Sequence, residues 1–551
     1  MLDQFLERTE FSSYEDFKQN YRLNIPGNFN FGFDVVDAWA ESEPRKKALV
    51  WCDDHGGEKI ITFAGMKALS NRAANLFAGL GIQKGDRVLL VLAQRWQYWP
   101  CAVALHKIGA VLIPASTQLT AKDVKYRCNA AGVKAIAAVD HAYVTGQIEG
   151  ALPECPTVEH KLIVGGSREG WLNLDEALEN CPEEFARPTG EAATRNHEIF
   201  LTYFTSGTTG MPKMVAHNHI HPLGHILTAR YWQRARDNGL HFTVLSDSGW
   251  AKFGWGKIYG QWICGAAVFA YDLDKFVPKN LLDKVARYKP DTFCAPPTMF
   301  RFMIQEDLSH YDLGFIRHCS TAGEPLNPEV YNRWKELTGL ELCEGFGQSE
   351  GPVLLANFDG FPPRPGSMGK PSPDYDIDIV DGEGNPCGVG EEGELVVRGI
   401  GERMPAGLFV EVYNDPEATK RALGGDMYRT GDIAWRDSKG YYWFVGRNDD
   451  MIKCSGYRIG PFEVESALME HPAVVECAIT GAPDPVRGQV VKATVVLAKG
   501  YAPCGALAKE LQDHVKKVTA PFKYPRVVEF VAELPKTTSG KIRRVEIREK
   551  G

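Results

Sequence analysis

Short apolar runs alternate with amphipathic stretches along most of this chain, and that rhythm constrains its fold more than any other feature. Residues 87–92 and 109–114 have the composition of buried strands, whereas residues 124–131 and 282–288 fit amphipathic helices. Strands that alternate with helices build largely parallel sheets with helices packed on their faces. The pattern therefore predicts an α/β fold.

The texture of the sequence changes after about Gly366. Residues 376–385 and 393–399 are short strand-like runs with Gly and Asp turns, which favour a small antiparallel barrel. Beyond Arg447 a compact α+β unit of roughly 100 residues follows, which is a usual domain size. Its expected elements are helices over residues 461–471 and 507–518 and strands over residues 474–481 and 490–497. A chain of 551 residues is too long for one hydrophobic core, so we expect a large body and this separate C-terminal unit.

Composition indicates a globular protein and argues against several functions. Lys and Arg total 62 against 70 Asp and Glu, and the net charge of −8 argues against a general nucleic-acid binder. The 13 Cys form no CxxC pair, so free thiols in a reducing compartment are expected rather than disulfides. No apolar run approaches the ~18 residues of a membrane span. The first 20 residues show neither a secretory nor a transit pattern, so we expect a cytoplasmic protein without integral membrane association.

The sharpest local signal is the string Thr205-Ser-Gly-Thr-Thr-Gly-Met-Pro-Lys213, which directly follows a strand-like segment. Its hydroxyls and glycines can present O–H and backbone N–H donors to phosphate oxygens, and Lys213 adds a suitable point charge. The candidate phosphate-binding residues are Thr205, Ser206, Gly207, Thr208, Thr209, Gly210 and Lys213. Because Met214 follows Lys213, the spacing is not that of the common nucleotide triphosphatases, which argues against a kinase or ATPase.

Four further motifs follow in order along the chain. They are Glu344-Gly-Phe-Gly-Gln-Ser-Glu350, Tyr428-Arg-Thr-Gly-Asp432, Gly446-Arg-Asn-Asp-Asp450 and Pro535-Lys-Thr-Thr-Ser-Gly-Lys541. With the phosphate loop they resemble the adenylate-forming enzymes, namely acyl-CoA synthetases, peptide-synthetase adenylation domains and firefly luciferase. Residues 300–308 and 518–526 are similar to the medium-chain acyl-CoA synthetases in particular. Phe346 and Ser349 stand where Tyr and Thr are commoner, and neither change should remove its contact.

The resemblance implies both a domain arrangement and a reaction. Residues 1–448 should form an adenylation and acyl-binding domain of two helix-flanked, mostly parallel sheets plus a small β-barrel. Residues 449–551 should form a small mobile α+β domain that rotates about a hinge at Asp449 and carries the catalytic lysine. The implied enzyme is an ATP-dependent, AMP-forming acid–CoA ligase that uses ATP, Mg²⁺ and coenzyme A. A homo-oligomer is possible.

The resemblance also assigns the nucleotide site. Phe346 should stack on adenine, and the Gly323-Glu324-Pro325 turn should line the other side of the base. Asp432 should accept both ribose hydroxyls, with Arg447 donating to the same sugar. The remaining ATP- or AMP-binding candidates are Glu344, Gly345, Gly347, Gln348 and Ser349.

Two charged groups should act on the phosphates. Glu350 has a hard carboxylate oxygen suited to Mg²⁺. Lys541 is the key catalytic candidate, since a cation between the attacking carboxylate and the α-phosphate lowers the electrostatic barrier. Lys213 is the second catalytic candidate.

Coenzyme A should contact both domains once the C-terminal domain has rotated. Gly456 would leave room for pantetheine beside the backbone. The coenzyme A candidates are Gln118, Ser455, Gly456, Tyr457, Arg458, Arg487 and Lys516.

The acyl pocket should be bounded by Trp250, Ala251, Ala322 and Gly347. Acetyl-CoA synthetases have Trp at the position of Gly347, where it closes the pocket after two carbons. Glycine should remove that floor, and each further buried methylene adds about 0.8 kcal/mol. We therefore expect a medium-chain, branched or cyclic (alicyclic or aromatic) acid as substrate and poor use of acetate.

Three other functions remain open from the sequence. An enzyme that adenylates an amino acid or aryl acid for an acceptor other than coenzyme A is the nearest alternative, because Asp247 lies near where such modules hold an α-amine. A luciferase-like oxygenase and a degenerate scaffolding relative are the others. The histidines at 217, 219, 221 and 225 resemble a metal cluster, but polar packing is the better interpretation because no nearby Cys or carboxylate completes a site.

Overall fold

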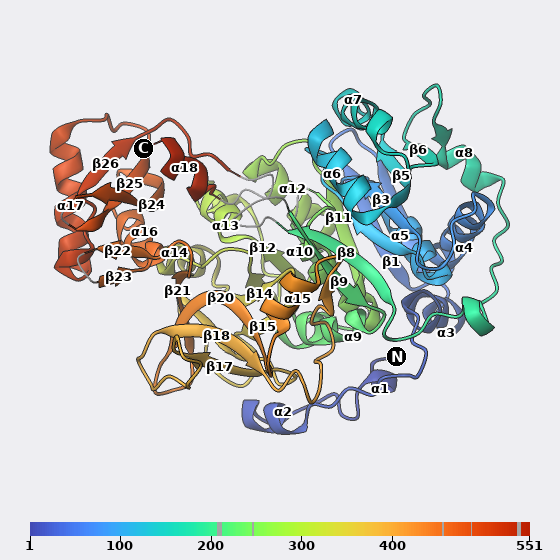
Figure 1. Ribbon diagram of the computed structural model, residues 1–551, viewed down its shortest axis with the longest axis horizontal. Coiled ribbons are helices and arrows are strands. Elements are labelled where there is room, and N and C mark those ends of the chain that lie inside the picture. The colour runs from blue at the N-terminus through green and yellow to red at the C-terminus, as the bar shows by residue number, and fades with distance from the viewer. Residues whose placement is uncertain (206–211, 245–246, 455–456, 486, 537–541, 551) are drawn as a thin grey trace.

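The computed structural model describes residues 1–551 except 206–211, 245–246, 455–456, 486, 537–541 and 551. In this part of the chain three sheets carry the fold (Figure 1), with eight, 13 and five strands. Helices separate most strands of the two larger sheets, and the predicted α/β class is confirmed. None of the described helices is long and apolar enough to cross a membrane.

The eight-stranded sheet has the order β19-β9-β8-β4-β3-β5-β6-β7 and is parallel from β8 through β7. Its strands are β3 (Arg87–Val91), β4 (Val111–Pro114), β5 (Val133–Val139), β6 (His160–Val164), β7 (Leu172–Asn173), β8 (Ile199–Thr205), β9 (Lys213–Asn218) and β19 (Glu411–Val412). The helices of this region are α4 (Phe63–Gly79), α5 (Tyr98–Ile108), α6 (Ala121–Ala131), α7 (Ala142–Ala151), α8 (Leu174–Glu179) and α9 (His221–Ile226). A capping box between Thr120 and Asp123 starts α6. This helix covers the predicted helical residues 124–131.

The 13-stranded sheet has the order β17-β18-β20-β21-β16-β15-β14-β13-β12-β10-β11-β1-β2. Its strands are β1 (Lys47–Asp53), β2 (Glu58–Thr62), β10 (Leu240–Thr243), β11 (Ala267–Asp272), β12 (Thr292–Ala295), β13 (His318–Thr321), β14 (Leu342–Gln348), β15 (Gly351–Ala356), β16 (Ser367–Pro371), β17 (Asp376–Val380), β18 (Gly393–Arg398), β20 (Met427–Arg436) and β21 (Tyr442–Arg447). The associated helices are α10 (Ala251–Gly256), α11 (Tyr259–Ile263), α12 (Pro278–Tyr288), α13 (Pro297–Met303) and α14 (Pro328–Thr338). The antiparallel strands expected after Gly366 are present, and the β15–β16 pairing makes them a continuation of the parallel strands.

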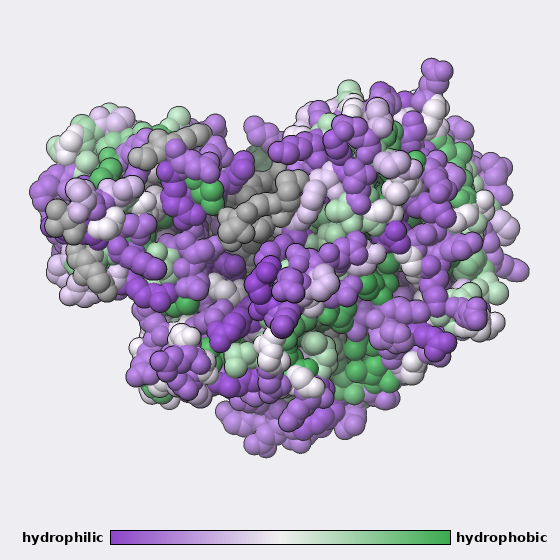
Figure 2. All heavy atoms as spheres, in the orientation of Figure 1, coloured by the Kyte–Doolittle hydropathy of each residue, from purple (hydrophilic) through white to green (hydrophobic). Residues whose placement is uncertain are grey.

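The five-stranded sheet lies entirely after residue 449. It consists of β22 (Ile452–Cys454), β23 (Tyr457–Ile459), β24 (Val474–Asp484), β25 (Gly488–Leu497) and β26 (Val527–Phe530), with helices α16 (Pro461–Met469), α17 (Gly505–Val518) and α18 (Arg544–Lys550). Its buried side chains form a core of their own, in which Ile479, Val464 and Leu511 are fully covered. Figure 2 shows an indented outline where this unit meets the rest of the molecule.

The remaining helices lie near the N-terminus and beside β20. They are α1 (Leu2–Phe5), α2 (Tyr14–Asn20), α3 (Ala38–Ser42) and α15 (Pro416–Leu423). All 13 cysteines are free, and most are buried, which confirms the expectation of unpaired thiols.

The carboxyl ends of parallel strands lie at one edge of a sheet, where α/β proteins bind their ligands. β8 ends at Thr205, β13 at Thr321 and β14 at Gln348. Since β13 and β14 are parallel neighbours, the Gly323 turn and the Glu344–Glu350 motif lie at the same edge of the 13-stranded sheet. Thr205, at the end of β8 in the eight-stranded sheet, is the first residue of the phosphate-loop motif. The fold therefore brings two of the predicted nucleotide-binding segments to one edge of the 13-stranded sheet.

Candidate active site

Three of the predicted nucleotide-binding side chains meet around one buried carboxylate. Asp432 on β20 is opposite Arg447 on β21 in the antiparallel register, and only 4% of it is exposed. Arg447 Nη1 donates to Asp432 Oδ1 at 3.2 Å, and Gln348 Nε2 donates to Asp432 Oδ2 at 2.5 Å. The Tyr428 hydroxyl donates in turn to Gln348 Oε1. Both carboxylate oxygens are thus oriented by donors from two other strands.

Arg447 is also surrounded by further negative charge. Its Nε lies 3.7 Å from Asp449 Oδ1. Burial opposes the charge of the guanidinium, but the carboxylates of Asp432, Asp449 and Glu350 outweigh this effect and raise the pKa of Arg447. Glu350, the predicted metal ligand, therefore belongs to the same electrostatic cluster as the predicted ribose site.

The predicted adenine-binding segments are held by local hydrogen bonds. Gly323 follows β13 with φ +108, a conformation that favours glycine. The Glu324 carboxylate accepts from the backbone N–H of Thr298 at 2.6 Å. Phe346 is half-buried, and its ring centroid lies 6.4 Å from that of Phe444. This geometry fixes the turn that contains Pro325 and leaves Phe346 partly accessible.

Glu344 supports this turn from behind. Its side chain is buried, and its Oε1 accepts from the backbone N–H of Leu326 at 3.2 Å. Burial raises the pKa of Glu344 from an ordinary value of 4.5 to about 8. The carboxyl is therefore largely neutral at pH 7, and its position indicates that it braces the turn rather than binding a cation.

The raised pKa of Glu344 predicts a pH-dependent stability. Between pH 4.5 and 8 the unfolded chain releases a proton that the folded protein retains, so folding becomes less favourable as the pH rises. Glu344→Gln keeps an oxygen acceptor for Leu326 without an ionisable group. We expect the variant to match the wild type at pH 4.5 and to be more stable at pH 8 by on the order of 4 kcal/mol.

Thermal unfolding at several pH values measures this difference. Glu417→Gln, at an exposed position of α15, is the control and should show no such trend. A stability difference for Glu344→Gln that is constant across the pH range would contradict the prediction.

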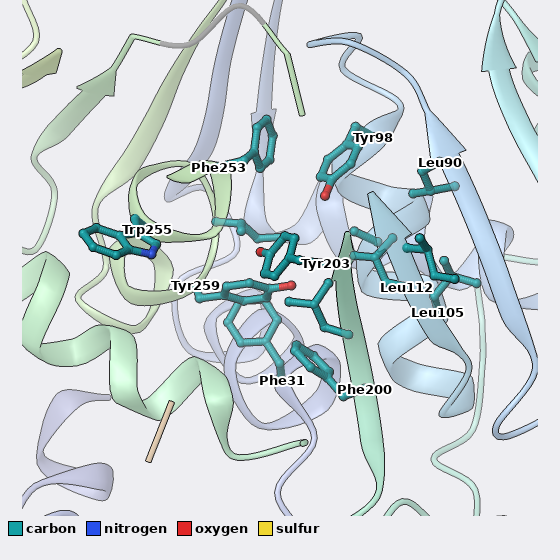
Figure 3. Packing of buried hydrophobic residues seen from close by; sticks show 14 of the residues in the cluster. Phe31, Leu90, Tyr98, Leu105, Leu112, Phe200, Tyr203, Phe253, Trp255 and Tyr259 are labelled. Atoms are coloured by element: carbon teal, nitrogen blue, oxygen red, sulfur yellow. The ribbon is translucent and has the colours of Figure 1, made fainter. Parts of the chain in front are cut away.

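The space that a side chain at Gly347 would need is filled by neighbouring atoms. A Cβ at Gly347 would lie 2.3 Å from the Pro352 carbonyl oxygen and 2.4 Å from Cη2 of Trp255. Glycine is needed here because the Trp255 ring takes the room that a side chain would need. Figure 3 shows Trp255 and Phe253 pointing to different sides of α10, with Phe253 toward Tyr98.

Of the other predicted pocket residues, Trp250 and Ala251 lie close to Trp255 in the chain. Ala322 follows β13, the strand that pairs with β14. Trp250 precedes α10 and is half-buried, and its indole N–H makes no hydrogen bond within the described part of the chain. Ala251 starts α10, whereas Ala322 follows β13 and is 2% exposed. Lys252 Nζ donates to the Ala322 carbonyl at 2.6 Å and so ties these two segments together.

Asp247 is fully engaged by its own surroundings. It is 3% exposed and accepts from the backbone N–H groups of Thr117 at 2.8 Å and Gly249 at 2.9 Å. The hydroxyls of Thr117 and Ser116 donate to it at 2.8 and 3.1 Å. Four donors already use this carboxylate, so it locks two loops together and has little capacity left to bind a substrate amine.

The clustered histidines contact one another and backbone carbonyls. His217 Nε2 lies 2.8 Å from the Ser349 carbonyl, His221 Nδ1 lies 3.1 Å from the Gly407 carbonyl, and the Nε2 atoms of His221 and His225 are 3.1 Å apart. Burial lowers the pKa of all four histidines, so they are neutral. Such neutral rings pack β9 and α9 behind the Ser349–Glu350 segment.

The predicted coenzyme A contacts are divided between the two units. Gln118 is exposed after β4, and its N–H donates to Ser116 Oγ at 3.2 Å. In the C-terminal unit Tyr457 is 53% exposed and stacks on Phe522, with ring centroids 4.3 Å apart. Two of the three cations there have side-chain partners: Arg458 donates to Asn448, and Lys516 pairs with Asp513 and lies over the Tyr524 ring. The backbone N–H of Arg487 donates to the Asp484 carboxylate at 2.8 Å.

Several predicted residues lie outside the described residues. They are Ser206, Gly207, Thr208, Thr209 and Gly210 of the phosphate loop, Ser455 and Gly456 of the coenzyme A set, and the catalytic candidate Lys541. The ends of the phosphate loop are described: Thr205 and the exposed Lys213 are register partners on β8 and β9. The Pro212 carbonyl accepts from the Tyr126 hydroxyl at 2.8 Å.

Sequence reasoning missed two contributors to this site. Tyr428 orients Gln348, and its place at the start of a motif gave a signal for such a role. Trp255 fills the space beside Gly347, and no local pattern distinguished it from the neighbouring aromatic residues.

Comparisons with known proteins show the family of the chain. The family model described as AMP-binding enzyme matches residues 36–403, and the model of the AMP-binding enzyme C-terminal domain matches residues 463–541. The chain belongs to the AMP-binding enzyme family. It is 42% identical to the human mitochondrial acyl-coenzyme A synthetase ACSM3 over 550 residues, which cover 98% of this chain and 92% of that protein. It is 44% identical to the human mitochondrial acyl-coenzyme A synthetase ACSM4 over 547 residues, 97% of this chain and 93% of that one.

Solved structures of the family have the same fold. The anthranilate CoA ligase AuaEII in complex with anthranoyl-AMP superimposes with a TM-score of 0.87 at 29% identity, over 96% of this chain and 98% of that one. The benzoate CoA ligase from Burkholderia xenovorans gives a TM-score of 0.81 at 26% identity, over 94% and 100% of the two chains. This member of the AMP-binding enzyme family is an AMP-forming acid–CoA ligase, which uses ATP, coenzyme A and a carboxylic acid.

Proposed function

We propose that this ligase activates a medium-chain, branched or cyclic carboxylic acid as its acyl-adenylate and transfers the acyl group to coenzyme A. The observation that carries the proposal is the convergence of Gln348, Asp432 and Arg447 at the carboxyl edge of the sheets. Asp432 would accept the ribose hydroxyls of ATP, and Arg447 would donate to the same sugar. Lys541 would stabilise the charge that develops as the carboxylate attacks the α-phosphate.

Mg²⁺ fits the donor set of this site. Glu350 provides a hard carboxylate oxygen, the ligand type that Mg²⁺ prefers, and it lies within the charged cluster around Arg447. When bound, the metal would neutralise phosphate charge. Glu350 would hold the metal close to Asp432, the carboxylate that we propose binds the ribose.

A hinge at Asp449 fits the contacts on its two sides. Before it, Arg447 is bound to Asp432 of the large domain. After it, Asp450 accepts from Arg548 at 2.7 Å and so belongs to the C-terminal unit. We therefore place the domain boundary between residues 448 and 449, so that residues 449–551 turn as one body between the two half-reactions.

The alternative of an amino-acid substrate is disfavoured by Asp247. The four donors described above use the acceptor sites of this carboxylate, which leaves little capacity to bind an α-amine at that position. Relatives and structural neighbours named as acyl-CoA synthetases and as anthranilate and benzoate CoA ligases support an organic acid instead.

Trp255 is expected to set the length of the acid. Trp255→Leu would move the wall beside Gly347 back, and each additional methylene that becomes buried should raise kcat/KM about fourfold. The ratio of kcat/KM for octanoate to that for butyrate measures the change. Trp171→Leu removes a similarly buried indole beside β7, the outer strand of the eight-stranded sheet, and serves as the control. Equal ratios in the two variants would remove Trp255 from the acid site.

Product analysis tests the function as a whole. With ATP, Mg²⁺ and an acid we expect pyrophosphate release, and with coenzyme A also AMP and the thioester. A panel of acetate, hexanoate, benzoate and cyclohexane carboxylate should show acetate as the poorest substrate. Formation of ADP and orthophosphate, or thioester without AMP, would refute the mechanism, and a preference for acetate would refute the acid class.

A further inference from the structure

An ion pair on α13 joins the large domain to the C-terminal unit. Arg301 Nη2 lies 3.3 Å from Glu476 Oε1 on β24, and Arg301 Nη1 lies 3.3 Å from the Met469 sulfur on α16. The side chains of Arg301 and Glu476 are 19% and 11% exposed, so the pair is well shielded from water. Figure 1 shows α13 on the side of the large domain that faces the C-terminal sheet.

Glu476 holds a second cation with its other oxygen. Lys536 Nζ lies 2.9 Å from Glu476 Oε2. Lys536 and Ile542 form an antiparallel bridge, and the N–H of Arg543 donates to the Pro535 carbonyl at 2.8 Å. The two ends of the segment that contains Lys541 are therefore joined to each other. We call these joined ends, Lys536 and Ile542, the base of the Lys541 segment, and Glu476 fixes it through Lys536.

The other end of the connection is the nucleotide site. α13 starts at Pro297, and the N–H of the next residue, Thr298, donates to Glu324 in the turn beside the proposed adenine position. One short helix thus carries both a contact to that turn and the arginine that reaches the C-terminal unit. Rotation of residues 449–551 would separate Glu476 from Arg301.

We propose that Arg301 is a positioning residue for adenylation, which acts through Glu476 and Lys536 to hold the base of the Lys541 segment against the nucleotide site. The inference rests on the proposed role of Lys541 in the first half-reaction. Arg301 contributes nothing to thioester formation, because that step takes place after the C-terminal unit has turned away. The pair therefore biases the enzyme toward the adenylation orientation.

The test separates the two half-reactions in the full-length enzyme. Adenylation is measured by acid-dependent exchange of pyrophosphate into ATP, and thioester formation is measured from synthetic hexanoyl-adenylate and coenzyme A. In Arg301→Gln the exchange rate should fall about tenfold, while thioester formation should stay within twofold of the wild type. Arg301→Lys should recover much of the exchange, because it restores a cation for Glu476.

Two further variants make the result specific. Glu476→Gln should reproduce the loss of exchange, and the double variant Arg301→Gln, Glu476→Gln should lose less than the product of the single effects, since the residues act as one pair. Arg317→Gln is the matched control: this arginine pairs with Asp291 within the large domain, and its loss should alter neither half-reaction.

The outcomes distinguish this inference from the proposed function. Unchanged exchange in Arg301→Gln, equal loss of both half-reactions, or strictly additive effects would overturn the role of Arg301. If Lys541→Ala still abolishes exchange in that case, the proposed function stands. If Lys541→Ala leaves exchange intact, the assigned role of Lys541 fails whatever Arg301 does.

Discussion

Lys541→Ala is expected to lower acyl-adenylate formation at least about a hundredfold while sparing thioester formation from supplied adenylate. The substrate carboxylate and the α-phosphate are both anionic, so the first half-reaction needs a cation where the new bond forms. In the second half-reaction the thiol of coenzyme A attacks the carbonyl carbon of the acyl-adenylate. This carbon carries no negative charge, so the cation is not required. Pyrophosphate exchange and single-turnover thioester formation report the two steps separately.

Lys509→Ala is the control for this variant. Lys509 is an exposed lysine of the same C-terminal unit that pairs with Asp513, and its removal should change neither step. Equal losses in both half-reactions of Lys541→Ala would contradict the proposed division of labour. Melting temperatures show whether either variant is misfolded.

Asp432→Asn is expected to reduce kcat/KM for ATP about a hundredfold, mainly through a higher KM. The carboxylate would lose its charge-assisted bonds to the ribose hydroxyls, and Arg447 would lose its nearest counter-charge in a buried position. Gln348 would also lose an ionic acceptor. The effect should therefore exceed that of a single surface hydrogen bond.

Steady-state kinetics with varied ATP, at saturating acid and coenzyme A, measure this loss. Asp376→Asn provides the comparison, because Asp376 is an exposed carboxylate on β17 of the same sheet. An unchanged KM for ATP in Asp432→Asn would remove this residue from the nucleotide site. A change in KM for the acid alone would place Asp432 in the acid site instead of the nucleotide site.

The sequence predicted the fold well where periodicity was strong. The strands beginning at Arg87 and Gly393 and the helix beginning at Pro461 were expected within a few residues of their observed positions. The continuation of the antiparallel strands into the large sheet could not be predicted, because it depends on the pairing of β15 with β16 rather than on local composition. β16 also pairs with β21, and such pairing between distant segments leaves little trace in one sequence.

The site shows the same division. Asp432, Arg447 and Gln348 were found because each lies in a distinctive motif, and the structure brings them together. The surroundings of Gly347 could not be predicted, because the ring that fills the space a side chain would need comes from residue 255, far away in the sequence. Arg301 was not predicted as a functional residue for the same reason, because its partner Glu476 lies on β24 of the C-terminal unit, far away in the sequence.

The unbroken ladder from β2 to β17 has a practical consequence for building hybrid enzymes. The strand that carries Asp432 and the strands beside the proposed acid site belong to one sheet, so they must be inherited from the same parent. The chain beyond Asp449 brings its own sheet and core and can be exchanged as a cassette. Such a chimera should keep the acid preference of the enzyme that supplies residues 1–448. The enzyme that supplies the C-terminal unit must provide a carboxylate to pair with Arg301.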